Sequence, residues 1–262
     1  MAAKDLNERF SLDVIGQSAR ARLTELLAKT VKRPQFNGVR LKQNLRPQAP
    51  IPGEWFDADY FEHGFKSNWT KGYHWSGFAG LFRDTAKFLV SMFPDATSFL
   101  DAGCAKGFLV RALRELGKET WGFDHSPWAL EHAERAARPF LQLASAEKAE
   151  FNRSFDLTLA FSLLESLTEA QALEFLRRAR EWTKQAFVAV VLVCEDETRR
   201  ERLLTSDGDL SRVTILSRAS WRQRFLDAGW KQDALHRVAE RTCRTHPLPA
   251  RMGWEILVYA PG

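Results

Sequence analysis

Phe99-Leu100-Asp101-Ala102-Gly103-Cys104-Ala105-Lys106-Gly107-Phe108 places a glycine-rich turn directly between a predicted strand and a predicted helix. The strand is SFLDAG and the helix is the amphipathic segment FLVRALREL. Glycine permits a tight turn and a close approach of the backbone to a ligand, because it carries no Cβ atom. Any strand-to-helix turn can use glycine, so this turn is evidence for a ligand-binding site only together with the residues around it.

The alternation of strand and helix continues on the carboxyl side of this turn. Further strands are expected in 119–126, 139–146, 155–166 and 186–194, and helices in 127–138 and 169–183. Short loops between such elements predict an α/β fold with a doubly wound, mostly parallel sheet, covered by helices on both faces. Ligands of these sheets bind at the carboxyl ends of the strands.

The two ends of the chain follow other patterns. Residues 1–53 are expected to hold an amphipathic helix over 10–31 and a basic, Pro-punctuated connector, and 54–92 an aromatic lid and helix. Residues 93–262 form the predicted core. At its end, a helix near 217–228 precedes two strand-like runs, LHRVAER (235–241) and WEILVYA (254–260), which are expected to form an antiparallel edge.

Two acidic residues at strand ends favour a ligand that contains a ribose. Asp101 precedes the turn, and Asp124 closes the next strand 124 − 101 = 23 residues later. An acid in the second position can accept hydrogen bonds from both ribose hydroxyls. An NAD-dependent dehydrogenase has the same two features but prefers G-x-G-x-x-G, whereas this turn reads G-C-A-K-G-F.

FLDAGCAKGFLVRALRELG followed by WGFDHS resembles the first two motifs of the class I S-adenosylmethionine-dependent methyltransferases, and FDLTLAFSLLESL is similar to their fourth. The resemblance covers about residues 97–185 well and the tail loosely. It implies a Rossmann-like sheet of seven strands with the last one antiparallel. The chain departs from the family's usual GxGxG turn at Ala105, and Ser166 stands where a histidine often follows the fourth-strand Glu.

The resemblance also implies which residues hold S-adenosylmethionine and its product S-adenosylhomocysteine. Asp101 lies close to the amino group of the methionine moiety, Gly103 and Ala105 line that moiety, and Asp124 binds the ribose. The remaining expected contacts are His125, Ala146 and Glu147 around the adenine, Phe161 and Ser162 below the methyl group, and Tyr60 or Tyr73 at the donor's carboxylate.

The aromatic segment before the core supplies the expected contacts to the methyl acceptor. Trp55 to Trp75 combines many rings with polar tips, which suits a lid. His63 and His74 are the candidates for a general base, since a hydroxyl or protonated amine acceptor must lose a proton. Aromatic residues before a core also commonly just pack on it.

The composition narrows the remaining function classes. The first residues are too charged for a signal peptide and no apolar run approaches a membrane span, so a cytoplasmic protein without membrane contact is expected. Three scattered cysteines favour free thiols over a disulfide framework or a metal site. The net charge of +5 comes from scattered Lys and Arg, which disfavours nucleic acid as partner.

The leading hypothesis is therefore a methyltransferase acting on an O or N atom of a small acceptor, such as a natural product or a peptide-derived compound. An RNA or protein methyltransferase and a catalytically silent cofactor-binding subunit are the alternatives. The acceptor and the oligomeric state cannot be inferred from the sequence.

Overall fold

A computed structural model describes residues 45–206, 208–232, 234–244 and 254–262. The predicted helix over 10–31 and most of the basic connector lie outside these residues. No helix of the described part is long and apolar enough to cross a membrane.

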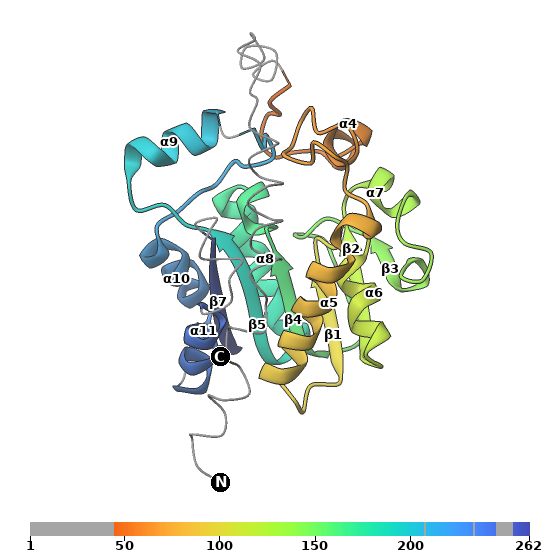
Figure 1. Ribbon diagram of the computed structural model, residues 1–262. Coiled ribbons are helices and arrows are strands. Elements are labelled where there is room, and N and C mark those ends of the chain that lie inside the picture. Colours follow the sequence, from red (N-terminus) through yellow and green to blue (C-terminus); the bar gives the residue numbers. More distant parts are fainter. Residues whose placement is uncertain (1–44, 207, 233, 245–253) are drawn as a thin grey trace, which may run out of the picture. The chain divides into compact units, whose positions relative to one another are not determined.

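The core is a seven-stranded sheet in the order β3-β2-β1-β4-β5-β7-β6 (Figure 1). Neighbouring strands from β3 to β5 pair in parallel, whereas β7 is antiparallel to both β5 and β6. The strands are β1 (Ser98–Ala102), β2 (Glu119–Asp124), β3 (Leu141–Leu143), β4 (Phe155–Phe161), β5 (Thr183–Leu192), β6 (Trp230–Lys231) and β7 (Trp254–Pro261). The predicted fold class is confirmed.

Helices cover both faces of this sheet. They are α4 (Ala58–Phe61), α5 (Trp75–Met92), α6 (Phe108–Glu115), α7 (Pro127–Glu131), α8 (Glu169–Trp182), α9 (Glu197–Ser206), α10 (Arg218–Asp227) and α11 (Ala234–Arg244), with short 3-10 turns at Gly53–Trp55, Arg138–Phe140 and Leu164–Ser166. Apolar side chains of α5 and α6 pack on one face, and those of α8 and α10 pack on the other. The central strands are buried on both sides of the sheet, and most of their residues are apolar.

Polar caps fix where the helices begin next to the ligand-binding edge. Ser126 accepts a hydrogen bond from Ala129 N at the start of α7, and Pro127 occupies the first turn. Thr168 and Gln171 form a reciprocal capping box at the start of α8. Helices α7 and α8 therefore start at defined residues beside the carboxyl ends of β2 and β4.

The prediction of a strand over 235–241 is wrong, because these residues belong to helix α11. The side chains of His236 and Glu240 are buried while Arg237 and Arg241 are exposed, a four-residue period typical of a helix. The partner of β7 at this edge is instead the short strand β6. The polar stretch 195–212 also contains a helix, α9.

Candidate functional site

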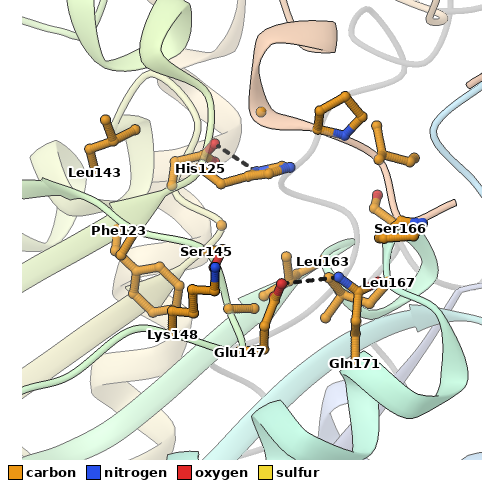
Figure 2. A pocket seen from close by; sticks show the side chains of 18 of the residues that line it. Phe123, His125, Leu143, Ser145, Glu147, Lys148, Leu163, Ser166, Leu167 and Gln171 are labelled. Carbon is orange, nitrogen blue, oxygen red and sulfur yellow. Dashed lines mark hydrogen bonds and ion pairs between the residues drawn. The ribbon is translucent and has the colours of Figure 1, made fainter.

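A cavity of about 420 Å³ opens at the carboxyl ends of the strands, beside the point where the strand order reverses between β1 and β4 (Figure 2). Crevices at this position are the usual ligand sites of doubly wound sheets. Five of the predicted site residues line the cavity: Gly103, Asp124, His125, Ala146 and Glu147. Its volume is in the range of small-molecule and cofactor sites.

Asp124, at the end of β2, is held in place by backbone donors. One carboxylate oxygen accepts a hydrogen bond from Ala105 N and the other from Ser126 N, both at 2.8 Å. Each oxygen keeps a second lone pair. The side chain can thus accept two more hydrogen bonds, which suits a pair of neighbouring hydroxyl groups in the cavity.

The glycine-rich turn after β1 approaches this carboxylate closely. The backbone N–H groups of Gly103 and Cys104 both donate to Phe123 O, which fixes the turn against β2. Ala105 has φ 47°, in the left-handed region where the family's glycine would be unstrained. Such a conformation costs an alanine about 1–2 kcal/mol, and the hydrogen bond to Asp124 helps to hold it.

Asp101 is buried below the turn. Burial, and next the charge of Asp124, raise the pKa of its carboxyl well above the usual range. Tyr73 lies within electrostatic range of Asp101, and its ring stacks on Phe108 at 4.4 Å between centroids. A cationic group placed between them would stabilise the ionised carboxylate.

The loop after β3 forms another part of the cavity wall. Ala146 is buried, and the side chains of Glu147 and Gln171 point toward one another, with Gln171 Nε2 donating to Glu147 Oε1 at 3.2 Å (Figure 2). On the neighbouring wall, His125 Nδ1 lies 3.6 Å from Asp124 Oδ1. Burial lowers the pKa of His125, but the neighbouring carboxylate of Asp124 outweighs it, so that the pKa is raised overall.

The aromatic segment packs over the N-terminus of α6 and around α7. Tyr60 lies at its inner edge, with its hydroxyl 3.3 Å from Ser211 Oγ. Ser211 Oγ donates to Asp209 Oδ1 at 2.7 Å, so Tyr60 is the donor to Ser211. Tyr60 and Tyr73 pack in one cluster with Ala105 of the turn, but neither lines the cavity. Burial raises the pKa of each phenol.

Six other predicted residues are absent from the cavity lining: Asp101 and Ala105, which lie two residues on either side of Gly103, and His63, His74, Phe161 and Ser162. His63 is exposed and pairs with Asp59 at 2.9 Å, and His74 is exposed at the start of α5. Phe161 ends β4, and Ser162 follows it with φ 53° and an exposed side chain. Neither histidine lines the cavity.

Residues 50–53, expected to lie at the end of the connector, and Glu54, expected to begin the aromatic lid, form part of the cavity wall. Gly53 packs directly on His125, since a Cβ atom on Gly53 would lie 1.8 Å from His125 O. Leu163, Leu167 and Gln171 also line the cavity. A glycine next to a proline gives no sequence signal for such a contact, because the partner backbone is distant in the chain.

Replacement of Gly53 by alanine should displace this wall. The backbone must move because no side chain can yield at 1.8 Å, and overpacking of this kind typically costs about 1–3 kcal/mol of unfolding free energy. Ligand affinity of the cavity should fall at least tenfold in calorimetry. Gly77→Ala is the matched control, since a Cβ there meets nothing within 4 Å; equal behaviour of both variants would contradict the assignment of Gly53 to the wall.

The chain matches the family described as a methyltransferase domain over residues 75–235, more than half of its length. No curated protein matches the sequence. Among solved structures, a putative O-methyltransferase from Nostoc punctiforme PCC 73102 shows a TM-score of 0.53 at 19% identity; the match covers 70% of this chain and 56% of that one. The CcbJ methyltransferase from Streptomyces caelestis shows 0.51 at 17% identity, covering 69% and 89%.

Proposed function

Since the chain belongs to the family of S-adenosylmethionine-dependent methyltransferases, we propose that it transfers the methyl group of this donor to an O or N atom of a small-molecule acceptor. The observation that carries the proposal is the cavity beside the β1/β4 reversal, with Asp124 fixed by two backbone amides and both oxygens able to accept more hydrogen bonds. Nothing further about the acceptor follows from the similar structures, which share only the fold.

The residues that line the cavity, together with Asp101 and Ala105 beside the lining residue Gly103, fit the parts of the donor. We assign Asp124 to the ribose hydroxyls, Gly103 and Ala105 to the methionine moiety, and Asp101 to its ammonium group. The buried carboxyl of Asp101 has a raised pKa and would be ionised by an adjacent cation. The adenine is assigned to His125, Ala146 and Glu147, which all line the cavity.

The residues outside the cavity wall are assigned to the reacting end of the donor. Tyr73, which lies near Asp101, and Tyr60, whose hydroxyl contacts Ser211, are proposed to meet the donor's carboxylate and the acceptor. Phe161 and Ser162 follow β4 and are proposed to lie below the methyl group. His63 or His74 remains a proposed base only if the acceptor reaches the exposed surface of the aromatic segment.

When bound, S-adenosylmethionine supplies a methyl group on a positively charged sulfur for an in-line displacement. The protein's own task is to orient the reactants and exclude water. The Tyr60–Ser211 contact joins the aromatic segment to residues 208–216, near the carboxyl ends of β4 and β5. A site bounded by these two joined segments supports an acceptor of modest size rather than a large polymer.

Calorimetry of the purified chain with S-adenosylhomocysteine, S-adenosylmethionine and NAD tests the proposed function. We expect dissociation constants in the micromolar range for both sulfur ligands, about −8 kcal/mol, and no binding of NAD. Asp124 and the turn fit either ligand class, so the comparison is decisive. Binding of NAD alone would reassign the cavity to a dehydrogenase.

A further inference from the structure

The side-chain amide of Gln171 has a fixed orientation at the edge of the cavity. Its Oε1 accepts hydrogen bonds from Thr168 N at 3.1 Å and from Thr168 Oγ1 at 3.0 Å. Because a backbone N–H can only donate, the oxygen of the amide must face Thr168. The nitrogen must then face the opposite way, toward Glu147.

This orientation determines how Glu147 lies in the cavity. Gln171 Nε2 donates to Glu147 Oε1, and Oε2 of Glu147 has no hydrogen-bond partner among the residues that the structure describes. Both side chains line the cavity and point toward one another (Figure 2). One carboxylate oxygen is thus used to fix the side chain, and the other remains to accept a hydrogen bond from a ligand.

We propose that Gln171 is a positioning residue that holds Glu147 so that the site selects a 6-aminopurine over a 6-oxopurine. The inference rests on the proposed function, because it takes the cavity as the site of the adenosyl group. An exocyclic amine donates to a carboxylate, whereas the oxygen of a 6-oxopurine would face it acceptor to acceptor. A site built to accept a hydrogen bond rejects the analogue that cannot donate it.

The capping role of Gln171 can be separated from its contact with Glu147. Glutamate serves in the same capping box as glutamine, so Gln171→Glu keeps the start of α8 intact. It removes the N–H donor, however, and places a second carboxylate against Glu147. Like charges at this distance repel, which turns Glu147 away from its position.

Helix α10 offers a matched control for the same substitution. Gln223 is exposed, and its Nε2 donates to Asp227 Oδ1 at 2.7 Å. Gln223 does not line the cavity. Gln223→Glu therefore creates the same pair of carboxylates on a helix without touching the site.

The test is calorimetry with S-adenosylhomocysteine and S-inosylhomocysteine, in which the 6-amine of the purine is replaced by a carbonyl and N1 gains a proton. The unsubstituted chain and Q223E should prefer the adenosyl ligand at least tenfold, and Q171E should lose at least tenfold of this preference while its melting temperature stays close to that of Q223E. An unchanged preference in Q171E, or an equal loss of affinity for both ligands, would overturn the inference and leave the function standing. Binding of neither ligand by the unsubstituted chain would overturn the proposed function itself.

Discussion

Asp124→Ala is expected to lower the affinity for S-adenosylhomocysteine at least a hundredfold. Two hydrogen bonds from ligand hydroxyls to an ionised carboxylate are lost, and each such bond is worth about 1.5–3 kcal/mol. The substitution also leaves Ala105 N and Ser126 N without their partner, so the turn loses the contact that holds Ala105 at φ 47°. Calorimetry with the purified variant measures the loss directly.

Asp84→Ala controls for the removal of one negative charge, because this carboxylate is 70% exposed on α5 and outside the cavity lining. Its affinity should match that of the unsubstituted chain. If Asp124→Ala and Asp84→Ala bound S-adenosylhomocysteine equally well, the assignment of Asp124 to the ribose would be wrong.

The position of Asp124 and of the turn was predictable from the sequence for a physical reason. A strand, a glycine-rich turn and a helix are local features, and parallel pairing of β1 with β2 brings the two strand ends together. The number of strands and the antiparallel last strand were predictable only through the family resemblance, because pairing between distant strands leaves no local signal. The run 235–241 shows this limit, since a short segment with mixed apolar and polar residues fits a strand as well as a helix.

The contacts between distant segments were not predictable. Gly53 is set against His125 by the path of the chain over the sheet, and Gln171 was visible in the sequence only as part of a helix. Its amide faces Glu147 because the capping box fixes the other end of the amide. Such a role depends on three residues from two elements, and no spacing in the sequence encodes it.

Glu165, in the turn after β4, is the buried acid whose chemistry the sequence did not reveal. Its Oε1 accepts a hydrogen bond from Leu192 N at 2.8 Å, whereas Oε2 has no partner among the described residues. Its backbone carbonyl accepts from Val213 N and Thr214 N, which attaches the segment that contacts Tyr60. Burial raises the pKa of Glu165 to about 7, although backbone hydrogen bonds and Arg212 oppose the shift.

This raised pKa predicts that the chain becomes less stable as the pH rises from about 4.5 to about 7. Below 4.5 the carboxyl is protonated in both the folded and the unfolded states, but between the two values the unfolded chain releases a proton that the folded chain retains. The free energy of unfolding should therefore fall by about 3 kcal/mol across this window, at 1.36 kcal/mol per pH unit.

Glu165→Gln removes the titration and keeps an oxygen for Leu192 N, while every other group titrates as before. Urea unfolding of both proteins at pH 5 and pH 8 gives the difference. Parallel changes in the two proteins would show that Glu165 is ionised in the fold at both pH values, with a counter-charge close enough to offset its burial.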